Sequence, residues 1–204
     1  MKRNYHFLNG LNLRIIAMVL MVIDHIAVLI FEFHLPINVN LYFFMRIIGR
    51  MALPIFAFLA VEGARYTHNI KKYLLRLGTM IVIMGIINSV IEYGFNVLHP
   101  PHNIFIDLFA GVTLVYFLMH PSKKNWWMLL PTIYALTINI LNTTLKMSYP
   151  AALKPDYGWY ATALFLGYFL AYRLARAYIQ KSTGITTWSE GELAHNYSFH
   201  LLYV

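Results

Sequence analysis

The sequence predicts an all-α integral membrane protein, a polytopic bundle of about six transmembrane helices with both termini in the cytoplasm. Three observations support this fold class. The 204-residue chain is 59% hydrophobic and only 12% charged, whereas a soluble domain would carry roughly 25% charged residues. Its apolar residues fall into stretches of about 20, the helix length that crosses a hydrocarbon core of about 30 Å. Its basic residues gather in alternate connections, as the positive-inside rule requires.

Six stretches qualify as spans, in the order of the chain. They cover approximately residues 13–33, 41–62, 73–92, 103–120, 126–145 and 158–178, with polar or proline-containing breakers between them. The basic N-terminus and the first span imitate a signal peptide, but the apolar run is too long and lacks a small-residue cleavage site. We therefore interpret it as a retained span. Residues 1–178 are expected to form a single membrane domain, and residues 179–204 a short cytoplasmic tail.

The orientation follows from the distribution of basic residues. Twelve of them fall on one side of the six spans, only Lys146 and Lys154 fall on the other, and Arg46 and Arg50 lie inside the second span. Because Lys and Arg concentrate in cytoplasmic connections, both termini are predicted to be cytoplasmic. The twelve residues on that side are Lys2, Arg3, Arg14, Arg65, Lys71, Lys72, Arg76, Lys123, Lys124, Arg173, Arg176 and Lys181.

Composition also limits the function. The formal net charge of +8 would suggest a nucleic-acid ligand in a soluble protein, but the topology accounts for it, so no nucleic-acid partner is expected. The chain has no cysteine, which excludes disulfides and thiolate catalysis. His99 and His102 flank two prolines in an outer loop that offers too few ligands for a metal, so no metal site is expected.

The first span carries Asp24 and His25 at mid-depth, and the second carries Arg46 and Arg50. Ionisable groups at membrane depth are costly, and they usually face a bundle interior or a wet cavity. At about 1.5 Å of rise per residue, Asp24 lies about 16 Å and Arg50 about 18 Å from the cytoplasmic side. A short loop joins the spans, so Asp24 or His25 is expected to meet Arg50, with Arg46 one turn further out. The alternative is a salt bridge that only holds the two helices together.

Arg14 and His25 are related by their spacing. They are eleven residues apart, close to three whole turns, so both lie within about 20° of one helix face and about 16 Å apart. An elongated anionic ligand would place its charged end at Arg14 and its other end at His25. Acyl-coenzyme A has this shape, with phosphates at one end and a thioester at the other. The alternative for Arg14 is ordinary snorkelling to the membrane surface.

Several segments carry a resemblance to a known family. LRIIAMVLMVIDHI and MRIIGRMALPIFAFLAVEG, followed by the basic KKYLLRL, resemble the TraX family of bacterial inner-membrane proteins. NIFIDLFAGV (103–112) and DYGWYATALFLGYFLAY (156–172) are similar to its later blocks, so the resemblance covers most of residues 11–175. Members of that family are associated with N-acetylation of conjugative pilin. The Arg14-x10-His25 pattern also resembles the basic-x10-His motif of larger membrane acyltransferases, whose histidine is assigned to acyl transfer.

The resemblance implies an inner-membrane acetyltransferase that uses acetyl-coenzyme A from the cytoplasm and an amine or hydroxyl acceptor, such as a pilin or a glycan. His25 is then the general base or a transient acyl carrier, with Asp24 beside it. Arg14 is expected to bind the coenzyme. Arg46 and Arg50 bind its phosphates, stabilise an oxyanion, or hold Asp24 ionised. A rival hypothesis is a proton-coupled transporter or channel with Asp24, His25 and Arg50 as its relay. A third is a scaffold whose buried charges fix helix pairing.

Three further charged residues are secondary candidates. Glu62 and Arg65 lie within one turn at the cytoplasmic end of the second span. They either rim the site or form a surface i,i+3 pair. Asp107 lies about a turn inside the outer face of the fourth span, where it either pairs with Arg46 or snorkels.

Overall fold

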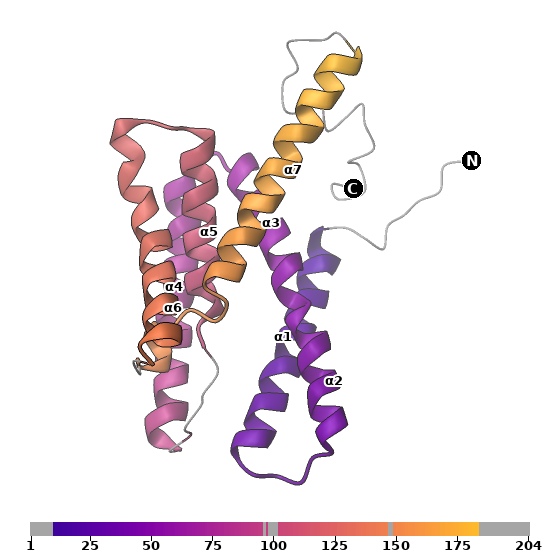
Figure 1. The fold of residues 1–204 in the computed structure, drawn as a ribbon, viewed down its shortest axis with the longest axis vertical. Helices are drawn as coiled ribbons and strands as arrows, with labels where there is room; N and C mark the ends of the chain where they lie inside the picture. Colours follow the sequence, from indigo (N-terminus) through magenta and orange to yellow (C-terminus); the bar gives the residue numbers. More distant parts are fainter. Residues whose placement is uncertain (1–9, 96, 98–101, 147–148, 184–204) are drawn as a thin grey trace, which may run out of the picture.

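The computed structural model describes residues 10–95, 97, 102–146 and 149–183, and this part of the chain is helical with no strand. The helices run roughly along one long axis (Figure 1). In chain order the elements are α1 (Gly10–Glu32), α2 (Val39–Arg50), α3 (Ala52–Tyr66), α4 (Ile70–Ser89), the π-helical turn η2 (Val90–Gly94), α5 (Ile104–Met119), the 3₁₀ helix η3 (Lys123–Leu129), α6 (Leu130–Thr144), the 3₁₀ turn η4 (Ala151–Leu153) and α7 (Trp159–Thr183).

Three helical segments of the described chain are long and apolar enough to cross a membrane. They are Gly10–Glu32, Val39–Tyr66 and Ile70–Gly94, of 23, 28 and 25 residues. The apolar helix α5 is shorter, at 16 residues. The predicted class, an all-helical membrane bundle, is confirmed.

Packing in the bundle has the character expected in lipid. The buried positions of α1 and α3 are mostly small, and large apolar side chains such as Ile47, Leu75 and Leu174 point outward with about two thirds of their surface exposed (67%, 71% and 70%). In lipid, helices associate through close backbone approach at small residues, and large side chains face the acyl chains. The buried alanines of these two helices are Ala17, Ala27, Ala52, Ala57, Ala60 and Ala64.

Helix α5 forms the centre of the bundle. It packs against α3, α4, α6 and α7, and residues such as Val112 and Val115 are completely buried. Gly111 permits the contact with α7, since a Cβ there would lie 2.3 Å from the Phe165 ring. Helices α1 and α2 pack against each other, and α1 also contacts α3.

The second predicted span is not one helix. It is divided into α2 and α3 at Met51, whose N–H bonds back to Ile48 rather than to residue 47. Pro54 supplies the reason, because it has no N–H to donate to the Arg50 carbonyl four residues earlier. The two helices together form the 28-residue apolar segment Val39–Tyr66, which contains the predicted span 41–62 and is long enough to cross a membrane.

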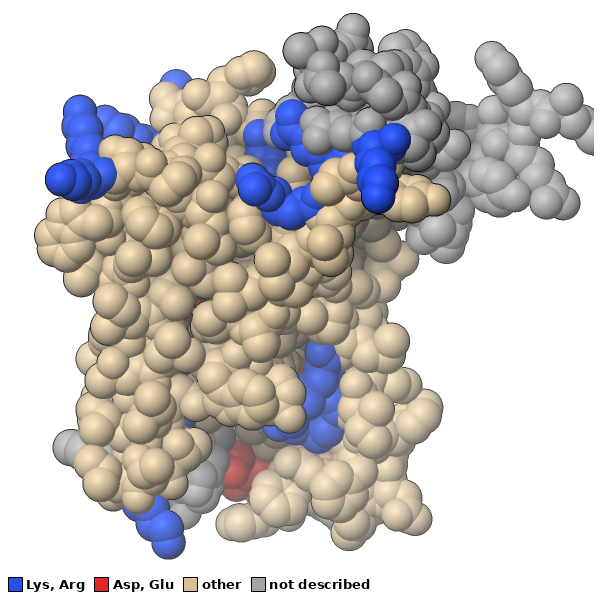
Figure 2. All heavy atoms as spheres, turned by 45° about the horizontal axis from the view of Figure 1, so that its top comes forward, with Lys and Arg blue, Asp and Glu red and all other residues tan. Residues whose placement is uncertain are grey.

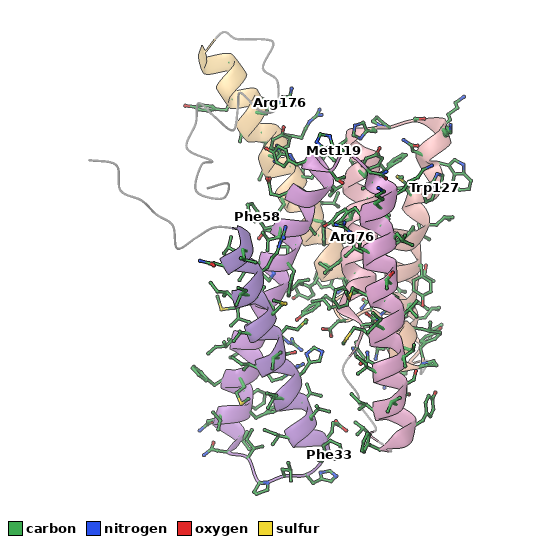
Figure 3. The ribbon with its side chains drawn as sticks, turned by 180° about the vertical axis from the view of Figure 1, so that it is seen from behind. Phe33, Phe58, Arg76, Met119, Trp127 and Arg176 are labelled. Carbon is green, nitrogen blue, oxygen red and sulfur yellow. The ribbon has the colours of Figure 1, made fainter. Side chains whose placement is uncertain are left out.

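The two ends of the bundle differ in charge. Figure 2 shows Lys and Arg gathered at the end where α7 projects, with acidic and basic side chains also visible in a hollow lower on the same face. We call the former the basic end; it includes the start of α1, the α3–α4 and α5–η3 turns and the end of α7. Figure 3 shows Met119, Trp127 and Arg176 at this end and Phe33 at the opposite end. The assignment of the basic end to the cytoplasm stays a prediction.

Helix α7 begins near the middle of the molecule rather than at its far end (Figure 1). The connection from α6, residues 145–158, therefore enters the bundle before α7 starts. At its other end α7 continues to Thr183, so residues 179–183 extend the helix and are not part of a separate tail. Residues 184–204, the rest of the predicted tail, lie outside the described residues.

Candidate functional site

A cavity of about 310 Å³ contains the buried charges of the first two spans. It extends from the middle of α1 toward the end opposite the basic end, between α1, α2 and two connections. Its polar lining comprises Asp24, His25, Glu32, Tyr42, Arg46, His102, Lys154 and Asp156. The predicted meeting of an acid, an imidazole and a guanidinium is thus observed.

The acid pairs with a different arginine from the one predicted. Arg46 Nη1 donates to Asp24 Oδ2 at 2.6 Å, and the two side chains are 21% and 9% exposed. Arg50 is exposed and makes no ion pair with any described residue. Arg50 lies at the level of Asp24 along the helices, as the helical rise predicted. However, its side chain points about 100° away from the direction of its neighbour Gly49, because successive helical residues are rotated by that angle. Because Gly49 faces Asp24, Arg50 is rotated away, and Arg46, one turn earlier, shares the face of Gly49.

Gly49 is a site residue that sequence reasoning missed. A Cβ at this position would lie 2.4 Å from Asp24 Cβ and 2.8 Å from Asp24 Cα and N. These are backbone and near-backbone atoms, so no rotamer change relieves the contact. The glycine therefore brings α2 against α1 at the level of Asp24, within reach of the Arg46 side chain. The sequence signal that could have identified this contact is the pair of small residues in MRIIGRMA, Gly49 and Ala52, which lie on one face of the predicted helix.

His25 has one nitrogen engaged and one free. Its Nδ1 lies 2.9 Å from the Met21 carbonyl oxygen, one turn back on α1. A carbonyl only accepts, so Nδ1 is the donor in this contact, and in the neutral imidazole Nε2 carries the lone pair. Nε2 is buried and has no hydrogen-bond partner among the described residues. An imidazole that lines a cavity and has one nitrogen without a partner is suited to act as a general base in its neutral form.

Asp107 neither pairs with Arg46 nor snorkels, so both predictions for it are wrong. It is 2% exposed, and its Oδ2 accepts from the N–H groups of Asp156 (2.7 Å) and Tyr157 (3.0 Å) while Oδ1 accepts from Gly158 (2.8 Å). Non-helical backbone at membrane depth must have its polar groups satisfied within the protein. Asp107 therefore holds the connection that enters the bundle ahead of α7.

Asn103 secures the same connection one turn earlier. Its backbone N–H donates to the Lys154 carbonyl at 3.0 Å, and its side-chain amide donates to the Ile81 carbonyl at 2.9 Å. Asn103 is fully buried. Asn103 and Asp107, both on the N-terminal side of α5, thus fix residues 154–158 against the cavity.

The outer connections supply cavity residues that sequence reasoning did not place in the site. His102 Nδ1 lies 3.6 Å from Asp156 Oδ1, with the side chains 31% and 23% exposed. Lys154 lines the same cavity; burial lowers the pKa of its amine, and Asp156 opposes that shift. No run of sequence joins these residues to α1, so only the fold brings them there. His99, the other histidine of the outer loop, lies outside the described residues.

Tyr157 lies next to this group. Burial raises the pKa of its phenol, and the charges of Asp156 and Asp24 act in the same direction while Arg50 and Arg46 oppose them. The phenol therefore keeps its proton at neutral pH.

The remaining predicted residues lie away from the cavity, toward the basic end. Arg14 is exposed, and its charge acts on the Tyr73 phenol. Glu62 and Arg65 form the i,i+3 pair, but both side chains are largely buried (14% and 8% exposed). The Arg65 guanidinium also stacks 3.3 Å above the Tyr172 ring, so the pair joins α3 to α7. Glu62 and Arg65 do not rim the cavity.

Within the described residues no group of His, Asp and Glu side chains has the arrangement of a metal site. The site thus combines a free imidazole nitrogen, a buried ion pair and a cavity that reaches one end of the bundle. These groups are suited to proton transfer during attack on a carbonyl.

A family model described as TraX protein matches residues 9–187. The searches of curated proteins and of solved structures returned no match.

Proposed function

Because the chain belongs to the TraX family, we propose that it is a multi-pass acetyltransferase of the bacterial inner membrane. The donor is acetyl-coenzyme A from the cytoplasm, and both termini are cytoplasmic. The acceptor is an amine or hydroxyl, with a pilin amine or a glycan as the leading classes. The observation that carries the proposal is the His25 imidazole, which lines the cavity and whose buried Nε2 has no hydrogen-bond partner among the described residues.

In this proposal His25 acts as general base, or carries the acetyl group transiently on Nε2. As base, Nε2 takes the proton from the acceptor while the acceptor nitrogen or oxygen attacks the thioester carbon. The new C–N or C–O bond forms, and the C–S bond breaks with its electron pair on sulfur. The imidazolium then returns its proton to the thiolate. Proton transfer of this kind contributes about 10²–10⁴-fold in rate.

The two arginines have different roles in this scheme. Arg46 holds Asp24 in place, as their 2.6 Å contact indicates. Arg50 has no carboxylate partner in the described chain and lies at the same level. It does not line the cavity, but its charge acts on the Tyr157 phenol beside the cavity, so we assign it to stabilise the oxyanion of the tetrahedral intermediate through its charge rather than by contact.

The donor approaches from the basic end. Arg14 and His25 lie on the continuous helix α1, so their predicted spacing of three turns applies. Met18, one turn from Arg14 on this face, is 48% exposed, so no neighbouring helix covers it. We assign the coenzyme phosphates to Arg14 and the flexible arm to this face of α1. The acceptor enters the cavity from the opposite end.

The break between α2 and α3 gives support to a second candidate, the proton-coupled transporter. Interrupted helices at mid-membrane are common at transporter binding sites. In that case Asp24, His25 and Arg46 would relay protons, with no chemistry on an acyl group.

Transfer of a labelled acetyl group by purified protein in detergent separates the candidates. We expect His25→Gln to abolish transfer and to leave acetyl-coenzyme A binding intact. His68→Gln is the matched control, because His68 lies in the exposed α3–α4 turn. Absence of transfer by the parent protein, together with proton-driven uptake in proteoliposomes, would favour the transporter.

A further inference from the structure

We infer that His102 and Asp156 form a second proton-transfer site, which removes the first proton from an ammonium acceptor before His25 acts. The inference rests on the proposed acetyl transfer and concerns its amine acceptors. It assigns a catalytic role to His102 and a supporting role to Asp156, at the end of the cavity away from Arg14.

The proton balance of the reaction requires such a group. An alkylamine is protonated at neutral pH, and its nitrogen has no lone pair for attack until one proton is lost. After attack the nitrogen must lose a second proton, which His25 accepts and returns to the coenzyme thiolate. Conversion of an ammonium and a thioester to an amide and a thiol therefore releases one net proton. His25 handles only the second proton, so the first needs another base and a path to solvent.

The geometry places an imidazole where that proton must leave. Between His25 and the basic end, α1 presents apolar residues such as Met21 and Met18, whereas the other end of the cavity is polar. His102 Nδ1 lies 3.6 Å from Asp156 Oδ1. This distance is too long for a direct hydrogen bond. It is short enough for the carboxylate to stabilise the imidazolium that forms when His102 accepts a proton.

Asp156 is held in position for this role. Its backbone N–H donates to Asp107 Oδ2 at 2.7 Å, and Asp107 also binds the next two amides. Both members of the pair are partly exposed (31% for His102 and 23% for Asp156), so a proton received from the acceptor can pass to water.

The other ionisable groups of the cavity are less suited to the task. A carboxylate is a weak base, whereas imidazole exchanges protons near neutral pH. Burial lowers the pKa of the Lys154 amine, but the charge of Asp156 opposes that shift and favours the protonated form, which is not a base. The groups that share the cavity with His102 are Asp24, His25 and Glu32 from α1, Tyr42 and Arg46 from α2, and Lys154 and Asp156 from the α6–α7 connection.

Two amines of similar shape test the inference in the full-length protein. Benzylamine is protonated at pH 7, and aniline is neutral at that pH. We expect His102→Gln to lower kcat/KM for benzylamine at pH 7 by roughly 10²-fold, the range of general acid–base catalysis. The loss should shrink as the pH rises and free benzylamine forms. Transfer to aniline and the KM for acetyl-coenzyme A should stay within about twofold of the parent, since neither depends on the first proton.

Two controls define the result. Asp156→Asn should give the same pattern with a smaller loss, because the imidazole remains. His68→Gln, at an exposed histidine outside the cavity, should match the parent with both amines. If His102→Gln lost activity equally with benzylamine and aniline, the role of His102 would be structural only. If it acetylated benzylamine at the parental rate, His102 would have no role. Either result overturns the inference and leaves the proposed function standing. A parent that acetylates neither amine overturns the inference, and a parent that transfers acetyl to no acceptor overturns the proposed function as well.

Discussion

Replacement of Gly49 by alanine should damage the site through a single methyl group. The added Cβ would lie 2.4 Å from Asp24 Cβ and 2.8 Å from Asp24 Cα and N. Ordinary van der Waals contact begins at about 3.4 Å, so α1 and α2 must separate by roughly 1 Å, the difference between 3.4 and 2.4 Å. Overpacking of this kind costs about 1–3 kcal/mol, and the better helix propensity of alanine offsets about 1 kcal/mol of that.

The catalytic effect should exceed the effect on stability. A separation of about 1 Å opens the 2.6 Å contact between Asp24 and Arg46 and moves the adjacent His25. Misplacement of a catalytic group by about 1 Å can cost 10²-fold in rate. We therefore expect Gly49→Ala to lower kcat for acetyl transfer by about 10²-fold, with a modest fall in the midpoint of thermal unfolding measured in detergent.

Gly78→Ala is the matched control, because Gly78 also lies inside a helix and an added Cβ there meets nothing within 4 Å. It should keep the parental kcat and gain up to about 1 kcal/mol of stability from helix propensity. If Gly49→Ala and Gly78→Ala behaved alike in both measurements, the close approach of α2 to α1 would not hold the site together.

Three other changes test the rest of the site. Asp107→Asn should lower the thermal midpoint, since an amide cannot accept from all three backbone N–H groups and a buried unsatisfied donor costs about 1–3 kcal/mol. Arg14→Ala should raise the KM for acetyl-coenzyme A and leave kcat unchanged, whereas Arg50→Ala should lower kcat, as steady-state kinetics with purified protein will show. Single cysteines are informative in this cysteine-free chain: in intact cells a membrane-impermeant maleimide should label Lys146→Cys and spare Lys71→Cys.

Each of these results has an outcome that would contradict it. An unchanged thermal midpoint in Asp107→Asn would show that the three amides find other partners. A fall in kcat with unchanged coenzyme affinity in Arg14→Ala would favour the snorkelling alternative for Arg14. Labelling of Lys71→Cys from outside would reverse the orientation, and with it the side from which the coenzyme arrives.

The sequence predicted much of the fold because membrane spans are read from local composition. Apolar length placed helix in each of the six predicted spans, and the shared level of Asp24 and Arg50 along the two helices followed from helical rise alone. The direction in which a side chain points around its helix could not be predicted in the same way, because it depends on which helix face contacts the neighbouring helix. Gly49 contacts Asp24, and this contact turns Arg46 rather than Arg50 toward the carboxylate.

The other half of the cavity could not be predicted from spacing. His102 and Asp156 lie 70 and 124 residues beyond the end of α1, in connections between predicted spans. Asp107 appeared to be a charge in need of a counter-charge, but its partners are three backbone amides. Side-chain to backbone contacts of this kind leave no complementary residue in the sequence to find.

The cavity also determines where the membrane potential falls. His25 is seven residues from the end of α1, about 10 Å, on the side where the cavity opens, and eleven residues, about 16 Å, from Arg14 on the other. When water fills the cavity, the electric field concentrates across the dry apolar layer between His25 and the basic end. Moving one charge through a full potential of 100 mV costs about 2.3 kcal/mol. The proton that the acceptor loses through His102 and the cavity crosses almost none of this potential, so turnover should proceed at the same rate in energised and de-energised membranes.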